Sequence, residues 1–199
     1  MQPVAQIVPY AEEPRDLLPL AHLFESEMKK YPPGFLNGRL DRVNLVRDLN
    51  VITHRAGGFF NPLFPSEITI ARGQPGSIFH HELAHLLWSQ SGTSEFEERW
   101  KQALPKGFSY PLFLGLLSDK KGRYSGSGRD GFVSEYAERN FHEDFAETAE
   151  HLFDPNGWIW IHAKRDPTIQ RKLDLMIEFY GSLDPRFTRT YFRRLESAE

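Results

Sequence analysis

The sequence feature that most restricts how this chain can fold is the run HHELAH at residues 80–85, because it sets polar side chains inside an otherwise apolar stretch. A helix over this stretch places His81 and His85 on one face, about one turn apart. The apolar neighbours predict that the helix is buried, and a buried histidine or glutamate needs a polar partner. Zinc is such a partner, because it binds imidazole nitrogens at about 2.0–2.1 Å. The spacing therefore predicts one Zn²⁺ per chain held by His81 and His85, with Glu82 placed to accept a proton from a zinc-bound water.

The composition narrows the choice of a third ligand. The chain has no cysteine, which excludes thiolate zinc sites, disulfide frameworks, iron–sulfur clusters and a cysteine nucleophile. The longer motif HExxHxxGxxH does not continue here, because Trp88 and Ser91 stand where that motif has glycine and histidine. His80 lies about 100° around the helix from His81, so we expect it to pack or to support the site rather than to bind metal. The third ligand is then a His, Glu or Asp from elsewhere in the chain.

The candidate segment for that ligand is 134–153, SEYAERNFHEDFAETAEHLF. A helix over its second half carries an acidic stripe formed by Glu143, Glu147 and Glu150. An acidic stripe is usually a solvated helix face, so the stripe alone does not identify a metal ligand. Asp144 is the strongest alternative to Glu143, although a helix turns it about 100° away.

The combination of HELAH with Tyr136, Glu143 and Glu147 resembles the anthrax lethal factor-like zinc metallopeptidases, which are gluzincins. In that family a tyrosine stands seven residues before the ligating glutamate, and a second glutamate follows the ligand by four within a pattern like E-F-F-A-E. This chain reads EDFAE at 143–147, with Asp144 in place of the first aromatic residue. The same positions are similar in the proline-specific secreted peptidases of clostridia and in the bacterial glucose-regulated metallopeptidase that titrates a transcriptional repressor.

The resemblance implies a role for each matching residue. It implies that the zinc ligands are His81, His85 and Glu143. Glu82 would be the general base, and Tyr136 would stabilise the oxyanion or assist the leaving group. Glu147 would orient a ligand histidine, as carboxylates behind zinc-bound histidines commonly do.

The expected fold class is α+β, because strands precede helices along the chain. Strands are expected at 43–49, 57–60 and 67–71. Helices are expected at 17–30, 77–90, 95–104, 140–153, 167–180 and 185–195. The resemblance implies a zincin-like domain, with a small, mostly antiparallel sheet packed on the active-site helix and a helical C-terminal part. In zincins the strand before that helix pairs with an extended substrate, so residues 67–71 are expected to do so here.

Length and charge bound the remaining possibilities. A chain of 199 residues predicts a single domain over 1–199, with strands in about 1–90 and helices in about 91–199. The Gly-rich segment 120–131 is expected to be a surface loop. The formal net charge of -3 provides no global basic field, so we expect neither nucleic acid nor a membrane as partner. No signal peptide is seen, which makes the cytoplasm the default location; a secreted chain whose signal was removed would look the same.

The predicted function is that of a zinc-dependent endopeptidase, which hydrolyses peptide bonds of an extended peptide or protein substrate through a zinc-activated water. The alternative is a zincin-fold binding module that titrates a protein partner with weak or no hydrolysis. Glu82 and Tyr136 favour hydrolysis, because binding alone requires neither.

Overall fold

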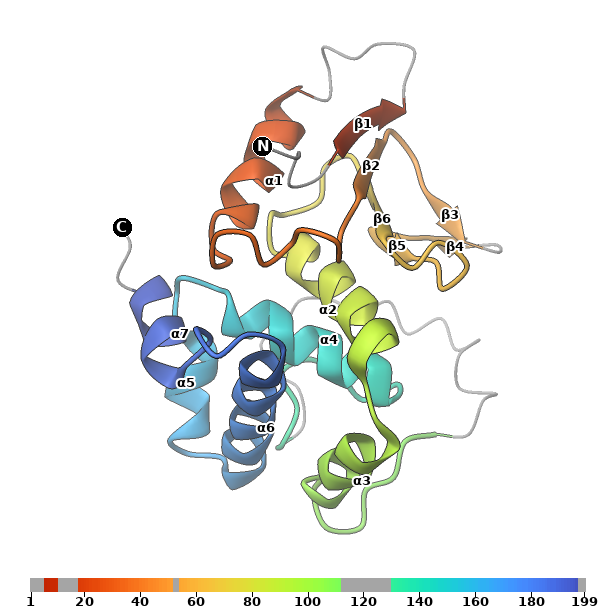
Figure 1. Ribbon diagram of the computed structural model, residues 1–199. Helices are drawn as coiled ribbons and strands as arrows, with labels where there is room; N and C mark the ends of the chain where they lie inside the picture. Colours follow the sequence, from red (N-terminus) through yellow and green to blue (C-terminus); the bar gives the residue numbers. More distant parts are fainter. Residues whose placement is uncertain (1–5, 11–17, 52–53, 112–129, 197–199) are drawn as a thin grey trace. The chain divides into compact units, whose positions relative to one another are not determined.

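The computed structural model describes residues 6–10, 18–51, 54–111 and 130–196 (Figure 1). It divides into two units, Met1–Gln90 and Ser91–Glu199. All described strands belong to the first unit, and five of the described helices belong to the second. The fold is therefore mixed α and β, which is compatible with the α+β class. A single domain over 1–199 stays a prediction. Most of the Gly-rich segment 120–131 lies outside the described residues.

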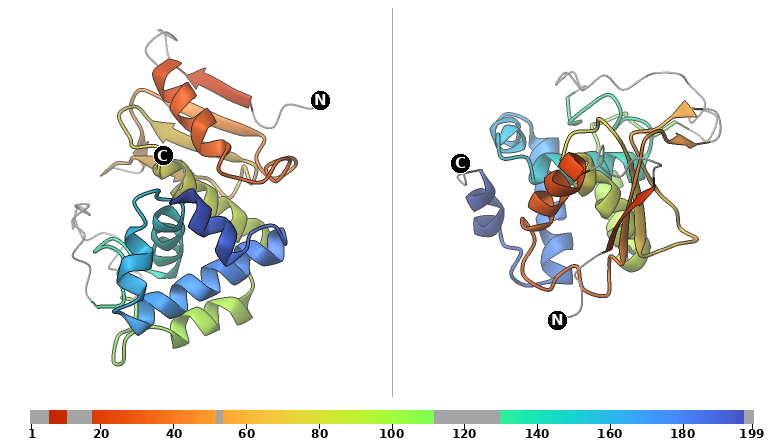
Figure 2. Two further views of the ribbon diagram at one scale, coloured as in Figure 1. Left: turned by 90° about the vertical axis from the view of Figure 1, so that its left-hand side faces the viewer. Right: turned by 90° about the horizontal axis from the view of Figure 1, so that it is seen from above.

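The first unit is built on a four-stranded sheet in the order β1-β2-β6-β5. Its elements are β1 (Gln6–Tyr10), α1 (Leu18–Met28), β2 (Arg42–Val46), β3 (Asn50–Val51), β4 (His54–Arg55), β5 (Gly58–Phe60), β6 (Glu67–Ala71) and α2 (Ile78–Ser91). β3 and β4 form a separate two-stranded ladder. Figure 2 shows α1 lying along one side of the four-stranded sheet.

Alternation of apolar and polar residues explains which face of this sheet is buried. Val43 and Leu45 in β2, like Ile68 and Ile70 in β6, are at most 1% exposed. The residue between each pair is only half-buried, as expected when successive side chains point to opposite faces. The parallel register pairs Val43 with Ile68, so the apolar residues of neighbouring strands share one face. The buried Phe24 of α1 and Phe79 of α2 contribute to the same core.

The expectation of a mostly antiparallel sheet is wrong for the four-stranded sheet. β1 pairs with β2 in parallel, β2 pairs with β6 in parallel, and only β5 pairs with β6 in antiparallel. The physical reason lies in the connections. A parallel pair requires a crossover, which α1 supplies between β1 and β2, whereas a short loop joins β5 to β6.

The expectation that residues 67–71 pair with a substrate is also wrong. β6 spans the predicted residues, but it lies between β2 and β5, and both of its ladder edges are occupied. Within the described sheet the edge strand beside β6 is β5. The edge strands are the ones whose backbone N–H and C=O groups are available to a further strand.

The second unit is helical where it is described. Its helices are α3 (Ser94–Gln102), α4 (Phe141–Leu152), α5 (Trp158–Ala163), α6 (Pro167–Leu183) and α7 (Arg189–Leu195). The predicted helices are found at these places, whereas α5 was not predicted. Asn140 is the N-cap of α4, and its side-chain oxygen accepts a hydrogen bond from the Glu143 backbone N–H at 3.0 Å.

Aromatic side chains fill the interior of the helical unit. Trp100, Phe145 and Phe179 are at most 4% exposed, and ring centroids of neighbouring members lie 5.0–5.7 Å apart. Such tilted or edge-on pairs add roughly 0.5–1.5 kcal/mol each beyond the burial of their area. This packing fixes α3, α4 and α6 against one another. None of the helices that the structure describes is long and apolar enough to cross a membrane.

Candidate metal centre

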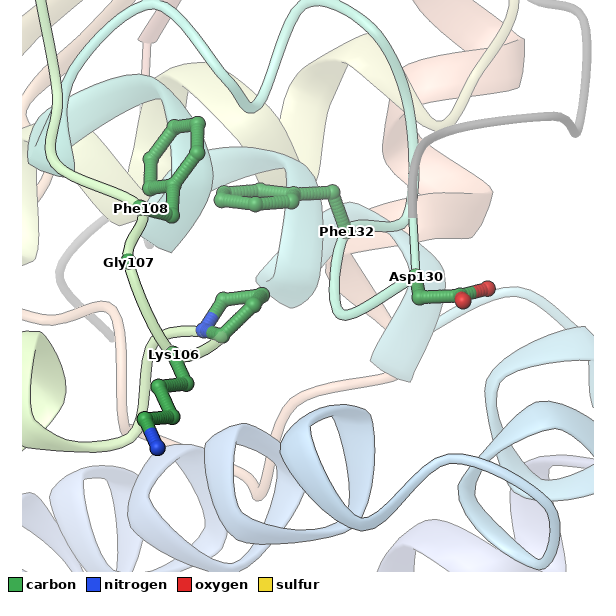
Figure 3. Close-up of a pocket in the computed structure, with 6 residues that line it drawn as sticks. Lys106, Gly107, Phe108, Asp130 and Phe132 are labelled. Atoms are coloured by element: carbon green, nitrogen blue, oxygen red, sulfur yellow. The ribbon is translucent and has the colours of Figure 1, made fainter.

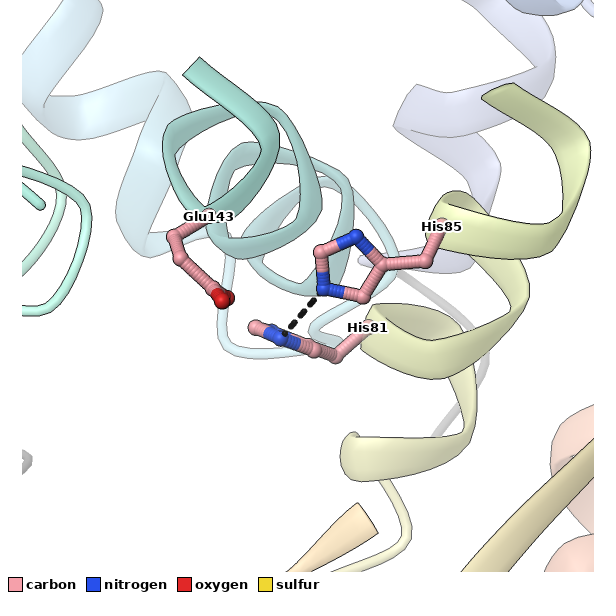
Figure 4. Close-up of side chains that lie close together, drawn as sticks. All are labelled: His81, His85 and Glu143. Atoms are coloured by element: carbon pink, nitrogen blue, oxygen red, sulfur yellow. Dashed lines mark hydrogen bonds between the residues drawn. The ribbon is translucent and has the colours of Figure 1, made fainter. Parts of the chain in front are cut away.

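The helix α2 carries the two histidines of the HELAH motif on one face. The Nε2 atoms of His81 and His85 are 3.2 Å apart, and their ring centroids are 4.9 Å apart with the planes at 76° (Figure 4). His81 is 5% exposed and His85 is half-buried. The apolar residues of the motif lie in the core, which confirms the prediction that this helix is buried.

The separation of the two nitrogens is a test of whether the pair fits a metal. Two ligands at about 2.0–2.1 Å from one tetrahedral zinc lie about 3.3 Å apart. The observed 3.2 Å between the Nε2 atoms matches that value. The two nitrogens are therefore spaced as two ligands of one zinc ion would be, and they are also within hydrogen-bond distance of each other.

Glu82 is the other polar residue of the motif on α2, and its side chain is buried at 4% exposure. Its carboxylate lies close to the backbone of β5. A side chain on Gly58 would begin 2.2 Å from the Glu82 Oε1 atom, which is far inside van der Waals contact. Glu82 therefore occupies space beside the edge strand that exists only because residue 58 is glycine.

His80 is buried as well, but its two ring nitrogens are engaged by protein oxygens. Nδ1 lies 2.7 Å from the Tyr31 hydroxyl and Nε2 lies 2.7 Å from the Glu27 carboxylate. Burial alone would raise the pKa of Glu27, but the bonds to His80 and Lys30 lower it overall. His80 thus connects α2 to α1, and it packs rather than offering a nitrogen to a metal, in line with the expectation for this residue.

The segment predicted to provide the third ligand belongs to the second unit. Glu143 lies in the first turn of α4 and is half-buried (Figure 4). Its position as the third residue of the helix is fixed by the Asn140 cap. Negative charge in the first turn of a helix is favoured by the helix dipole.

Asp144, the alternative ligand, is fully buried and is used inside the helical unit. Its Oδ2 atom accepts hydrogen bonds from Trp100 Nε1 at 2.9 Å and from the Tyr110 hydroxyl at 2.6 Å. The Lys172 ammonium lies 2.6 Å from the same oxygen. Burial lowers the pKa of Lys172, although the nearby Asp144 acts in the opposite direction. This network gives Asp144 a structural role, and it removes the main competitor of Glu143.

Tyr136 and Glu147 lie on either side of the start of α4. Tyr136 is half-buried in the turn that precedes the helix, and the Arg139 guanidinium lies 4.4 Å from the centre of its ring. Glu147 is buried, and it accepts a 2.6 Å hydrogen bond from the Ser134 hydroxyl. Ser134 in turn accepts from the Ala137 backbone N–H at 3.1 Å. These bonds tie the turn that carries Tyr136 to the helix that carries Glu143.

A pocket elsewhere in the second unit has none of the predicted site residues in its wall. It has a volume of about 210 Å³ and is lined by Pro105, Lys106, Gly107, Phe108, Asp130 and Phe132 (Figure 3). The residues expected to bind metal or to take part in catalysis therefore lie outside this pocket.

Two groups of His and Glu side chains in the described part of the chain could hold a metal ion. One is His81, His85 and Glu143, and the other is His81, Glu147 and Glu150. The first has the composition of a catalytic zinc site with two histidines and one glutamate. In the second, Glu147 already accepts a hydrogen bond from Ser134. The donor chemistry favours the first group.

Two residues beside this site were not predicted from the sequence. Gly58 borders Glu82, and Ser134 binds Glu147. A glycine in an expected strand is a sign of close approach by another group, so Gly58 could have been noticed, although not its neighbour. Nothing in the sequence marks Ser134.

No family model matches the chain, and neither a curated protein nor a solved structure matches it.

Proposed function

We propose that the protein is a zinc-dependent endopeptidase that cleaves an extended peptide or protein segment. The observation that carries the proposal is the pair of Nε2 atoms 3.2 Å apart on a buried helix, with the Glu82 carboxyl group on the same helix. Two imidazoles at zinc-ligand separation and an adjacent carboxylate are the parts that metal-assisted hydrolysis requires. A hydrogen bond between the two rings gives the same separation, so the metal assignment rests on this distance together with the Glu82 and Glu143 carboxylates.

The proposed ligands are His81 and His85 of α2 and Glu143 of α4. Bound zinc would supply a water that ionises near pH 7 and a positive charge for the developing oxyanion. Glu82 takes the proton from the attacking water and passes it to the departing amine. Tyr136 donates a hydrogen bond to the oxyanion, and Glu147 orients a ligand histidine.

The substrate is proposed to bind as an additional strand at the edge strand β5. This strand pairs with β6 on one side only within the described sheet. Strand addition provides backbone hydrogen bonds that do not depend on the sequence of the substrate. Because the Glu82 carboxylate lies against β5, a peptide bound at this edge would run past the general base.

The proposal includes a zincin-like fold and a relationship to the anthrax lethal factor-like gluzincins. The relationship rests on HELAH, on Tyr136 and on EDFAE at 143–147. Asp144 departs from the family pattern, in which an aromatic residue follows the ligand. In this chain the Asp144 carboxylate is buried against Lys172, so the helical core accommodates the departure.

The decisive experiment compares metal content with peptide-library cleavage in the wild type and in Glu82→Gln. We expect about one zinc per chain in both proteins and a loss of cleavage of about 10²–10⁴-fold in the variant, because general-base catalysis contributes that much. Tyr136→Phe should keep zinc and lose at least about 10²-fold. Glu98→Gln, at an exposed carboxylate on α3, is the matched control and should change neither quantity.

The outcomes separate the two functions that the sequence allows. A wild-type chain without zinc and without cleavage of any library peptide contradicts the peptidase proposal. Bound zinc with no cleavage, together with a biological effect that survives Glu82→Gln, would instead identify a protein-binding module.

A further inference from the structure

The edge strand β5 begins with a glycine at the point where it faces the core. In the antiparallel register Gly58 pairs with Ile70, which is fully buried, and Phe60 pairs with the buried Ile68. Directly paired residues of antiparallel strands point to the same face. A side chain at position 58 would therefore point to the buried face of the sheet, where Glu82 of α2 lies.

The space at Gly58 is occupied by the side chain of Glu82. An added Cβ would lie 2.2 Å from the Glu82 Oε1 atom and 2.6 Å from each of its Cδ and Cγ atoms. The clash extends along the side chain from Cγ to the carboxylate, so a rotation of the carboxylate alone does not relieve it. The whole end of the Glu82 side chain would have to move.

The backbone gives no reason for glycine at this position. The glycines with positive φ are Gly34, Gly38, Gly73, Gly107, Gly131 and Gly157, and Gly58 is not among them. Glycine inside a strand is unfavourable because it has no side chain to pack and loses more conformational freedom. Only the close approach of Glu82 explains a glycine here.

We propose that Gly58 is a positioning residue. Because it has no side chain, the Glu82 carboxylate has room to lie beside the edge strand at which the substrate is proposed to bind. The inference rests on the proposed peptidase function. A general base works only within hydrogen-bond reach of the proton that it accepts, about 2.6–3.2 Å between heavy atoms. A displacement of 1 Å at a catalytic group can lower the rate by about 10²-fold. A methyl group on residue 58 would displace Glu82 by at least that order.

The first test is the kinetics of Gly58→Ala. We expect kcat to fall by at least about 10-fold, KM to change by less than about 3-fold, and the zinc content to stay at the wild-type level. Gly57→Ala is the matched control. Its Cβ would also clash, at 2.6 Å, but with the Gln74 Oε1 atom instead of Glu82. This variant should keep wild-type kcat.

Two double variants separate positioning from general damage. In the Glu82→Gln background, Gly58→Ala should cause no further loss of the residual rate, because residues that act as a unit are not additive. In the metal-free protein, Gly58→Ala should lower Tm, and adding Glu82→Ala should restore most of that loss. This second measurement does not depend on activity, and it remains informative if Gly58→Ala folds poorly.

The failures of the two proposals are distinguishable. If the wild type is active and Gly58→Ala and Gly57→Ala have equal kcat, the role assigned to Gly58 is wrong. The peptidase proposal is unaffected by that result. Tm losses for Gly58→Ala and Glu82→Ala that simply add in the metal-free protein overturn it as well. A wild type without zinc and without cleavage overturns the peptidase proposal, while the Tm cycle still reports whether Gly58 makes room for Glu82.

Discussion

Two pairs of neighbouring residues show how adjacent polar side chains take different roles. His80 connects α2 to α1 through Tyr31 and Glu27, whereas His81 lies beside His85. On α4, Asp144 binds Lys172 in the helical core, whereas Glu143 is half-buried in the first turn. A step of one residue turns a side chain by about 100°, which is enough to separate a structural group from a candidate ligand.

Because Glu143 and Asp144 have different roles on α4, substitutions at these two adjacent positions should have opposite effects on zinc binding and on stability. Glu143→Ala should abolish stoichiometric zinc binding and change the free energy of unfolding of the metal-free protein by less than about 1 kcal/mol. Asp144→Ala should destabilise the protein by about 3–5 kcal/mol, because it leaves the Lys172 ammonium buried without its carboxylate. Zinc titration and urea unfolding measure the two effects.

The control for Asp144→Ala is Asp174→Ala. Asp174 is half exposed and pairs with Arg189 at the surface, so its loss should cost at most about 1 kcal/mol. Equal destabilisation by the two substitutions would contradict the role assigned to the buried network.

At the scale of elements, individual helices and strands with a clear pattern were predictable from the sequence. The order and direction of the strands in the sheet were not. The strand expected at 67–71 and the helix expected at 140–153 correspond to β6 and α4. β1 was missed because Pro9 interrupts an otherwise short apolar run. α5 was missed because its alternating Trp and Ile residues lack a helical period. Strand order depends on pairing between distant segments, so no local pattern distinguished the inner strand β6 from the edge strand β5.

The candidate site was predictable to a similar degree. The HELAH spacing identified the residues on α2 because a single helix determines their geometry. Glu143 and Tyr136 came from the resemblance to a family, and they remain predictions. Gly58 could not be assigned to Glu82 from the sequence, because only the packing of β5 on α2 brings the two together.

The cap of α4 should affect both the helix and the metal. Asn140→Ala removes the bond that the Glu143 backbone N–H donates, and it should cost about 1 kcal/mol of stability. Because Glu143 lies in the turn that this bond fixes, we also expect weaker zinc binding, measured by competition with a chelating dye. Thr188→Ala, at the equivalent cap of α7, should cost similar stability without any change in zinc affinity. An unchanged zinc affinity in Asn140→Ala would contradict the coupling.

At the scale of the whole molecule, the proposed zinc site predicts that metal binding and folding are coupled. A ligand that binds only the folded state stabilises it by about 4 kcal/mol when it is present at 1,000 times its Kd. We therefore expect zinc to raise Tm and a chelator to reverse the increase, as measured by calorimetry. In Glu143→Ala the increase should disappear. An equal increase in that variant would show that zinc binds without α4.

The parallel ladders of the first unit have a consequence for the order in which the protein folds. Gln6 pairs with Arg42 and Arg42 pairs with Glu67, so each ladder closes a long loop of chain before it gains any pairing energy. α5 joins α4 to α6 locally, but the hydrogen bond from Trp100 to Asp144 spans 44 residues. Folding rates fall as the sequence separation of contacts grows. Both units should therefore fold slowly compared with a bundle of local contacts, and the edge strand β5 should be held against α2 only after the parallel ladders have closed.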